Sequence, residues 1–368
     1  MKILLTGNTA FKIANFREGL VRQLISDGHE VIVLAPEDQY VAQIRSLGCH
    51  FEPLKMQRNG TNPFQELKLL RDIYRCIREH KPDMVFSYTV KNNIYSGISC
   101  RLMKVPFAPN VTGLGPAFNN KGVLNKAIKI LYRFAFSRAR RIFFQNDSDL
   151  DTFRAARLAT SEQAQLLPGS GVDLARFRYE DMQEGRAEIR FLLVARLLWE
   201  KGIGLYVEAA REIRKHHPSV RFQVLGPLDI ESKSGILRSQ IDVWVEQGCI
   251  EYLGTTHDVT GYLADADCIV LPTYYNEGTP RSLLEAGAIG RAIITTDQPG
   301  CREVVLDKSS GYLIAPRDID SLISACKSYL ALESHERALM SRTSRKHVEK
   351  NYDEDIVIKA YLALLSQA

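Results

Sequence analysis

The sequence predicts an α/β protein of two domains, each built on a parallel β-sheet that helices cover. Three observations predict this fold. The chain has 368 residues, and a length prior of roughly 150 residues per domain suggests two domains. Short apolar runs alternate with helical patterns through both halves of the chain. A stretch rich in glycine and proline, Leu166–Asp173, interrupts this alternation near the middle.

The first half of the chain alternates strand and helix patterns. Helical patterns include Phe16–Ser26 and Phe64–Glu79. This rhythm is typical of a parallel sheet with helices on both faces. The predicted strands are Lys2–Thr6, Glu30–Ala35, Cys49–Leu54, Met84–Tyr88, Phe107–Val111 and Arg141–Gln145.

The second half repeats the scheme after a polar stretch that runs to Glu188. We therefore expect domains at residues 1–167 and 168–350, with 351–368 forming a last helix that crosses back to the first domain. Two similar α/β halves imply a cleft between the carboxyl ends of the two sheets. The predicted strands of this half are Arg190–Val194, Arg221–Leu225, Ile250–Leu253, Cys268–Leu271 and Ala292–Thr296.

Composition and charge exclude several classes of function. A net charge of +5 is too small to indicate a nucleic-acid partner. The seven cysteines form no C-x-x-C pair, which indicates a reducing cytosol. Because a strand begins at Lys2, we expect no signal peptide. Since no apolar run approaches the roughly 18 residues of a spanning helix, any membrane contact should be peripheral.

One β-turn-α stretch, Tyr274–Asp297, offers two glutamates, Glu277 and Glu285, around a Gly-Thr-Pro turn. Pro280 suits the first position of a helix. The backbone amides of Arg281, Ser282 and Leu283 would then be unpaired donors at a positive helix end, which attracts phosphate. Two acceptors beside an anion site suit a nucleotide sugar. On spacing alone, two solvated glutamates at a helix start remain an equal alternative.

A second motif, Ala195–Gly202, carries two cations after the first strand of the second half. Arg196 and Lys201 should reach the same sheet edge as Glu277, where they could neutralise a leaving diphosphate. Alone, this segment would be an exposed basic loop. Its co-occurrence with Glu277 and Glu285 favours the diphosphate site.

Together these residues resemble a known family. Arg196 and Lys201-Gly202, followed by the run Glu277-Gly-Thr-Pro-Arg-Ser-Leu-Leu-Glu285, are similar to the family 4 retaining glycosyltransferases, with two Rossmann-like domains in the GT-B arrangement. In the first half, the runs 110–115, 117–118, 88–92 and 58–63 resemble bacterial members that extend undecaprenyl-diphosphate-linked sugars, above all lipid-linked N-acetylgalactosaminyltransferases.

The resemblance implies roles for the residues of the second half. Arg196 and Lys201 would hold the donor's diphosphate, Glu277 would contact the sugar hydroxyls and Glu285 the ribose. The nucleotide base should lie near Tyr252–Gly254. The turn around Pro280 would complete the phosphate cradle through the amides of Gly278, Thr279 and Leu283.

The reaction that the resemblance implies is same-face transfer with retention at the anomeric carbon. The leaving diphosphate would itself take the acceptor proton, and the protein would supply positioning and electrostatic stabilisation. A covalent double displacement needs two carboxyls about 5–5.5 Å apart that flank the bond. Glu277 and Glu285 flank a phosphate-binding turn instead.

The acceptor side is predicted in the first half. Arg58 and Lys91 are candidates for the acceptor's diphosphate, with ordinary surface charge as the alternative. Many family members place a histidine in the loop where this chain has Thr112-Gly113, and we assign these two residues to the acceptor side.

The segment 121–141 has the pattern of a basic amphipathic helix. At about 100° per residue, its cations Lys126, Lys129, Arg133 and Arg140 share one sector roughly 60° wide. Such a helix can lie on an anionic bilayer. A core helix with a solvated basic edge is the alternative, but a lipid-linked acceptor favours membrane contact. The expected apolar side is Leu124, Ala127, Ile128, Leu131, Phe134 and Ala135.

We predict no metal ligand set and no cofactor. The UDP-sugar would be a co-substrate. Asp265-Ala-Asp267 reads as a connection into the strand Cys268–Leu271, and the chain has no G-x-G-x-x-G. We therefore expect a metal-independent glycosyltransferase at the cytoplasmic face of the cell membrane, which transfers N-acetylhexosamine to a polyprenyl-diphosphate-linked saccharide. A UDP-sugar epimerase, a transferase with a soluble acceptor and a nucleotide-sugar-binding scaffold are the alternatives.

Overall fold

The computed structural model describes residues 1–57, 62–114, 123–183, 188–229, 232–275 and 277–367. The chain forms two compact units. Unit 1 contains residues 1–171 and 354–368, and unit 2 contains residues 172–353. Within the described residues, no helix combines the length and apolarity that crossing a bilayer requires.

Unit 1 is a parallel sheet of seven strands in the order β3-β2-β1-β4-β5-β6-β7. Its strands are β1 (Lys2–Thr6), β2 (Glu30–Ala35), β3 (His50–Pro53), β4 (Met84–Tyr88), β5 (Phe107–Val111), β6 (Ile142–Phe144) and β7 (Ala164–Leu166). Its helices are α1 (Ala10–Phe16), α2 (Glu18–Ser26), α3 (Val41–Ser46), α4 (Pro63–His80), α5 (Val90–Met103), α7 (Val123–Phe136), α8 (Asp147–Ala155) and α15 (Glu354–Leu365).

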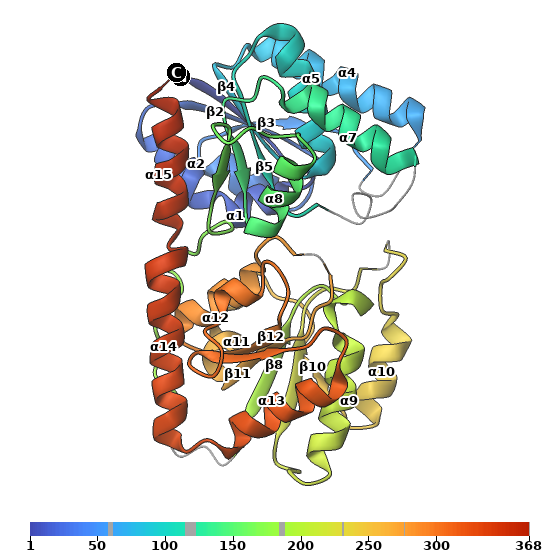
Figure 1. Cartoon of the computed structure of the whole chain (residues 1–368), viewed down its shortest axis with the longest axis vertical. Coiled ribbons are helices and arrows are strands. Elements are labelled where there is room, and N and C mark those ends of the chain that lie inside the picture. The colour runs from blue at the N-terminus through green and yellow to red at the C-terminus, as the bar shows by residue number, and fades with distance from the viewer. Residues whose placement is uncertain (58–61, 115–122, 184–187, 230–231, 276, 368) are drawn as a thin grey trace. The chain divides into compact units, whose positions relative to one another are not determined.

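The core of unit 1 lies on both faces of this sheet. Along β1, Ile3 and Leu5 enter one apolar cluster and Leu4 enters the other, as expected of a strand buried on both sides. Helices α1, α2, α3 and α15 cover the first face, and α4, α5 and α7 lie side by side on the second (Figure 1).

Unit 2 is a parallel sheet of six strands in the order β10-β9-β8-β11-β12-β13. Its strands are β8 (Arg190–Val194), β9 (Arg221–Leu225), β10 (Glu251–Tyr252), β11 (Cys268–Leu271), β12 (Ala292–Thr296) and β13 (Gly311–Ile314). Its helices are α9 (Ile203–Arg214), α10 (Arg238–Glu246), α11 (Thr260–Asp265), α12 (Arg281–Ile289), α13 (Ile319–Ala331) and α14 (Ser334–Tyr352), with 3₁₀ turns η1 (Trp199–Lys201) and η2 (Arg302–Val304).

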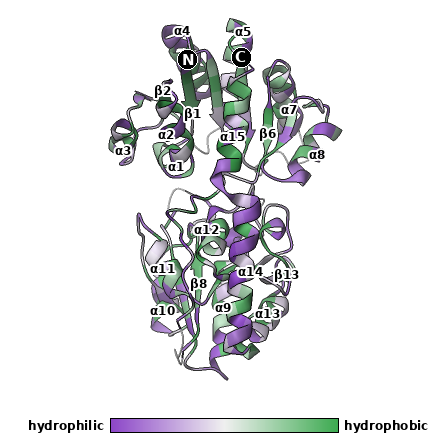
Figure 2. Ribbon diagram, turned by 90° about the vertical axis from the view of Figure 1, so that its left-hand side faces the viewer, coloured by the Kyte–Doolittle hydropathy of each residue, from purple (hydrophilic) through white to green (hydrophobic). Residues whose placement is uncertain are grey.

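Helices also cover both faces of this second sheet. Residues of α9, α10 and α13 pack on one face, and residues of α11, α12 and α14 pack on the other. Figure 2 shows the hydrophobic residues concentrated in the strands, whereas α14 is largely hydrophilic. The prediction of two parallel-sheet α/β units is confirmed.

The last helix, α15, contributes to the core of unit 1. Tyr361 is fully buried and packs edge-to-face on Phe86, with ring centroids 4.8 Å apart. Its ring also lies 4.6 Å from that of Phe143. Its hydroxyl accepts a hydrogen bond of 3.1 Å from the Asn110 side chain. The chain thus leaves unit 2 after Asp353 and completes the core of unit 1.

Two details differ from the sequence prediction. The edge strands β7 and β13 are short and were not predicted, because polar and glycine residues dilute their apolar patterns. The predicted helix Phe16–Ser26 begins too early: Phe16 ends α1, α2 starts at Glu18, and the two helices meet at Arg17, which has φ −134° and ψ 10°. Arg17 is buried with its guanidinium 4.5 Å from the centre of the Tyr88 ring, so its side chain turns into the core.

Candidate active site

In the candidate site of unit 2, the 3₁₀ turn η1 is hydrogen-bonded to the loop after β11. The carbonyl of Glu200 accepts hydrogen bonds from the amides of Tyr274, at 2.9 Å, and Tyr275, at 3.2 Å. The Thr273 hydroxyl lies 3.1 Å from the same carbonyl. These contacts hold η1, which ends at Lys201, against the segment that leads to Glu277.

Gly202 makes this close approach possible. Its φ is +77°, and a Cβ added there would lie 2.1 Å from the carbonyl oxygen of Pro272. Any larger residue would therefore push η1 away from the loop after β11. The Lys201-Gly202 pair thus works as a unit, in which the glycine allows the lysine to reach the site.

Lys201 and Glu277 form an ion pair in which both side chains are nearly buried, with 13% and 11% exposed. The Thr273 hydroxyl lies 3.2 Å from the same carboxylate oxygen, Oε1, of Glu277. The ammonium also lies 5.5 Å from the centre of the Tyr275 ring. The structure therefore brings together two of the predicted residues that come from different βα loops.

Arg196 lies near the same group. Burial raises the pKa of the Tyr275 phenol, the charge of Glu277 raises it further, and the charge of Arg196 opposes this rise. The Arg196 guanidinium itself pairs with Asp229 at 2.7 Å, and its side chain is 50% exposed. Charged side chains of both signs thus act on a half-buried tyrosine.

The start of α12 differs from the prediction in two respects. Pro280 is the N-cap and not the first helical residue, because its ψ of 118° is extended. The Leu283 amide is not an orphan donor, since it donates to the Pro280 carbonyl at 3.1 Å. Gly278 is buried and Thr279 half-buried in the turn that precedes this cap.

Glu285 lies one turn inside α12 and is held by Arg281, whose Nε is 3.0 Å from its Oε1. Both side chains are largely buried, with 11% exposed for Arg281 and 14% for Glu285. Burial raises the pKa of Glu285, and the charges of Arg281 and Arg176 oppose that rise. The i, i+4 spacing of Arg281 and Glu285 on a predicted helix is a signal for this pair that the sequence analysis did not use.

Gly254 follows β10 at the same sheet edge. Its φ is +77°, and its carbonyl accepts a hydrogen bond of 2.8 Å from the Gly226 amide after β9. No described atom lies within 4 Å of the position that a Cβ of Gly254 would take. The space next to the Gly254 backbone is therefore open.

Lys91, one of the predicted acceptor residues of unit 1, is held by other residues of that unit. Lys91 pairs with Glu66 at 2.6 Å and donates to the Gln57 carbonyl at 3.0 Å. Glu66 also accepts a hydrogen bond of 2.6 Å from the Tyr95 hydroxyl. Lys91 is therefore a largely buried cation with partners in its own unit, and its contact with the acceptor's diphosphate stays a prediction.

Thr112 and Gly113 follow β5 directly, and Gly113 has a φ of +105°. Both therefore lie at the carboxyl edge of the unit 1 sheet, where parallel α/β folds bind ligands. Arg58 and the motif residues 115 and 117–118 lie outside the described residues.

The predicted basic helix over 121–141 is longer than the helix in the structure, α7. The helix ends at Phe136, so Arg140 lies beyond it, where its amide donates to the Phe107 carbonyl at 2.9 Å. Its apolar side is only partly buried: Tyr132 and Ala135 face the core, whereas Phe134 is 41% exposed. Leu131 at 37% and Ile130 at 67% are exposed too.

A close helix contact explains this narrow buried stripe. Gly97 of α5 faces Ala135 of α7, and a Cβ added to Gly97 would lie 2.9 Å from the Ala135 Cβ. Ala135 and its neighbour Phe136 are buried at this point, whereas Phe134 lies at the margin of the contact, with the Arg101 guanidinium of α5 4.3 Å from the centre of its ring. Among the cations of α7, Lys126 and Arg133 are exposed and Lys129 is half-buried.

Sequence reasoning missed several side chains that shape the site. Tyr275 and Thr273 lie within four residues of Glu277, and their proximity to it could have indicated them. Asp229 gave no signal beyond its position after β9, whereas Arg281 could have been found from its i, i+4 spacing to Glu285. The partners of a predicted cation depend on packing that a single sequence does not contain.

Comparison with known proteins identifies the family of the chain. The family described as glycosyl transferases group 1 matches residues 188–331, and the glycosyl transferase 4-like family matches residues 2–146. The chain is 26% identical to the N,N'-diacetylbacillosaminyl-diphospho-undecaprenol alpha-1,3-N-acetylgalactosaminyltransferase of Campylobacter jejuni, over 99% of this chain and 98% of that protein.

A second relative is the UDP-Gal:alpha-D-GlcNAc-diphosphoundecaprenol alpha-1,3-galactosyltransferase of Escherichia coli, 27% identical over 71% of this chain and 70% of that enzyme. Among solved structures, the Anabaena protein Alr3699/HepE in complex with UDP and glucose superposes with a TM-score of 0.81 over 100% of both chains, at 16% identity. That likeness concerns the fold.

The family matches and the relatives define this chain as a glycosyltransferase, more narrowly a hexosyltransferase. The chain belongs to the family 4 retaining glycosyltransferases with the GT-B fold, and it is similar to bacterial enzymes that act on undecaprenyl-diphosphate-linked saccharides. The family predicted from the motifs is confirmed.

Proposed function

We propose that this enzyme transfers a hexose, with N-acetylhexosamine as the expected sugar, from a UDP-sugar to an undecaprenyl-diphosphate-linked saccharide. The reaction retains the configuration at the anomeric carbon and serves the assembly of a bacterial surface or glycoprotein glycan. The observation that carries the proposal is the Lys201–Glu277 pair at the carboxyl edge of the second sheet. A relative that matches over 99% of this chain and 98% of its own length, and whose name gives such a lipid-linked substrate, supports the acceptor.

In the proposed reaction, Lys201 and Arg196 hold the donor's diphosphate and stabilise the charge that grows on it as the glycosidic bond breaks. Glu277 accepts hydrogen bonds from the sugar hydroxyls, and Lys201 keeps that carboxylate in place. The acceptor hydroxyl approaches on the face that the diphosphate leaves, and its proton passes to a diphosphate oxygen. No side chain is required as a general base.

The nucleoside side of the donor is assigned to the first turns of α12 and to the end of β10. Glu285, oriented by Arg281, would accept hydrogen bonds from the ribose hydroxyls. The backbone of Gly278, Thr279 and Leu283 would face the phosphates, although Leu283 would have to share its amide with Pro280. The open space at Gly254 would admit the base.

We further propose that unit 1 rests peripherally on the cytoplasmic leaflet of the cell membrane. Exposed apolar side chains and cations lie together on α7, as with Ile130 and Phe134 beside Arg133. Such a surface can insert apolar groups while its cations meet anionic headgroups. Past the helix end, a hollow of 240 Å³ is lined by four cations: Arg101, Lys104, Arg138 and Arg140.

The test is an assay with a panel of UDP-sugars and a synthetic polyprenyl-diphosphate-linked saccharide. We expect one UDP-sugar to give a longer lipid-linked product and free UDP, with an α-anomeric linkage by NMR. Epimerised donor without transfer would instead identify an epimerase. Transfer to water-soluble saccharides alone would indicate a soluble acceptor, and tight UDP-sugar binding without any reaction would indicate a scaffold.

A further inference from the structure

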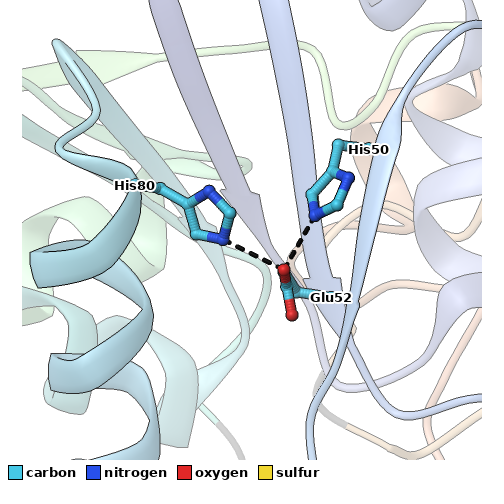
Figure 3. A group of neighbouring side chains, drawn as sticks. All are labelled: His50, Glu52 and His80. Atoms are coloured by element: carbon cyan, nitrogen blue, oxygen red, sulfur yellow. Dashed lines mark hydrogen bonds and ion pairs between the residues drawn. The ribbon is translucent and has the colours of Figure 1, made fainter.

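A group of three side chains outside the candidate active site brings two imidazoles to one carboxylate. His50 and Glu52 lie on β3, and His80 is the last residue of α4 (Figure 3). The Nε2 atom of His50 lies 2.7 Å from Glu52 Oε1, and that of His80 lies 3.0 Å from the same oxygen. The potential ligand atoms of the three residues all lie within 4.8 Å of one another.

Secondary structure explains why these residues meet. Residues i and i+2 of a strand point to the same side, so His50 and Glu52 share one face of β3. Strand β3 is the edge of the seven-stranded sheet, and α4 ends next to it. The positions 50, 52 and 80 have no metal-ligand spacing, which is why the sequence indicated no metal site.

We propose that His50, Glu52 and His80 form a binding site for a divalent transition-metal ion of the Zn²⁺ class. Two imidazoles and one carboxylate are a ligand set that suits such ions. Mg²⁺ instead takes oxygen ligands. Water would complete the coordination, since the His50 side chain is 53% exposed and that of Glu52 is 34% exposed.

The observed distances need little adjustment for such an ion. Ligands at about 2.1 Å from a tetrahedral ion lie about 3.4 Å from one another. The imidazole–carboxylate separations, 2.7 Å for His50 and 3.0 Å for His80, are shorter than this, so binding of an ion would move the ligand atoms apart by less than about 1 Å. Each imidazole would change from the Nε2–H to the Nδ1–H tautomer, so that its Nε2 lone pair faces the ion. This change moves a proton within each ring and releases none from a neutral histidine.

The position within unit 1 indicates a structural role. His50 begins its strand and His80 ends its helix, so both lie at the edge of the sheet opposite to the carboxyl ends. An ion there would fasten the short edge strand β3 to α4. The other end of α4 carries Glu66, which holds Lys91 and Tyr95. The ion would thus stabilise unit 1 without entering the transfer reaction.

The test uses tag-free full-length protein that has been treated with a chelator and exchanged into chelator-free buffer. Calorimetric titration with ZnCl₂ should give one tight site per chain, and Co²⁺ should give visible absorption bands. His50→Gln and His80→Gln should each weaken Zn²⁺ binding more than about tenfold, because even outer-shell partners of a metal contribute 10–100-fold. Glu52→Gln should do the same while it keeps an acceptor oxygen for both imidazoles.

His335→Gln is the matched control, because His335 pairs with Glu333 at 3.3 Å on the surface of unit 2. This variant should bind Zn²⁺ as the wild type does. Zn²⁺ should also raise the Tm of the wild type and of H335Q, but not that of H50Q/H80Q. Circular dichroism would check that each variant is folded.

Equal Zn²⁺ affinity in wild type and H50Q/H80Q would overturn the proposal, as would a loss in H335Q equal to that in H50Q. Mg²⁺ that binds as tightly as Zn²⁺ at this site would overturn the assigned class of ion. Retained transfer activity in the chelated protein would agree with the structural role. Loss of activity that Zn²⁺ restores in the wild type but not in H50Q/H80Q would overturn that role.

Discussion

The Lys201–Glu277 pair is the central interaction of the site at the scale of single residues. A nearly buried ion pair costs desolvation on both sides, and removal of one partner leaves an uncompensated charge. Such a pair is therefore weak support for stability. Its arrangement is better explained by function, because it holds a cation ready for an anionic ligand and orients a carboxylate next to it.

The first prediction concerns this lysine. Lys201→Ala should lower kcat by on the order of 10²-fold, as expected when one group that stabilises transition-state charge is lost. Steady-state kinetics with the UDP-sugar identified by the panel would measure this loss, and UDP titration would show whether ground-state binding falls less than kcat. Lys215→Ala, which removes an exposed lysine of the same unit, is the control. A kcat of Lys201→Ala close to wild type would exclude the proposed role.

A second prediction concerns Glu285. Glu285→Ala should weaken UDP binding roughly tenfold to a hundredfold, since hydrogen bonds to a charged group contribute about 1.5–3 kcal/mol. Because Arg281 would lose its buried partner, the variant also needs a stability measurement. Glu285→Gln keeps an acceptor oxygen for comparison and should lose less affinity. Unchanged UDP affinity in a folded Glu285→Ala protein would remove this residue from the donor site.

The third prediction is a pH dependence at Asp149, in the first turn of α8. Burial raises the pKa of this carboxyl from 3.8 to about 6, although a hydrogen bond from Asn146 opposes the rise. The folded state therefore binds more protons than the unfolded state between these values, and its stability falls as pH rises through that window. One pKa unit corresponds to about 1.4 kcal/mol.

Asp149→Asn should therefore gain stability relative to the wild type as pH rises from about 4 to 7, and the difference should level off above that. Urea denaturation at several pH values would measure it. The Asn146 side chain, which lies 3.2 Å from Asp149, keeps an acceptor in the variant. If the stability difference between Asp149→Asn and the wild type did not depend on pH, burial would not raise the pKa of the Asp149 carboxyl.

At the scale of elements, the long apolar strands could be read from the sequence and the side-chain partners could not. Most buried strands, such as β4 and β11, coincide with their predicted bounds. Their residues are buried on both faces, so the pattern is continuous and its limits are sharp. Edge strands such as β7 have fewer apolar residues to mark them.

In the site, too, the position of the loops could be predicted from the sequence, whereas most side-chain partners could not. The sheet edge that carries Lys201 and Glu277 follows from topology, because carboxyl ends of parallel strands meet there. The pairs Arg196–Asp229, Arg281–Glu285 and Lys91–Glu66 depend on rotamers and packing between segments distant in sequence or one turn apart. The same reason explains why the histidine cluster of unit 1 was not foreseen.

The fourth prediction concerns α7. Exchange of Lys126, Lys129 and Arg133 for glutamine should weaken binding to anionic vesicles by about 1 kcal/mol per charge. Cosedimentation with vesicles that contain phosphatidylglycerol would measure this. A matched control removes three exposed cations from α14, at Arg342, Lys346 and Lys350. Identical partitioning of the α7 variant and the wild type would contradict the proposed membrane surface.

At the scale of the whole molecule, the chain builds two cores and passes between them twice, at Gly171–Val172 and at Asp353–Glu354. Each unit has its own parallel sheet with an apolar cluster on either face. Yet unit 1 is complete only with residues from the far end of the chain, among them Val357 and Tyr361. Since folding of unit 1 needs the last helix, it should finish only after unit 2 has been synthesised.

The last prediction tests this division through Tyr361. Tyr361→Ala removes a fully buried ring between Phe86 and Phe143 and leaves Asn110 without its hydroxyl partner, so it should destabilise unit 1 by about 3 kcal/mol or more. Scanning calorimetry should then show two transitions, of which the earlier belongs to unit 1. UDP should raise only the later one, because a ligand stabilises the unit that binds it. A variant in which UDP shifts the weakened transition would place the nucleotide contacts in unit 1, against the assignment of Lys201 and Glu285.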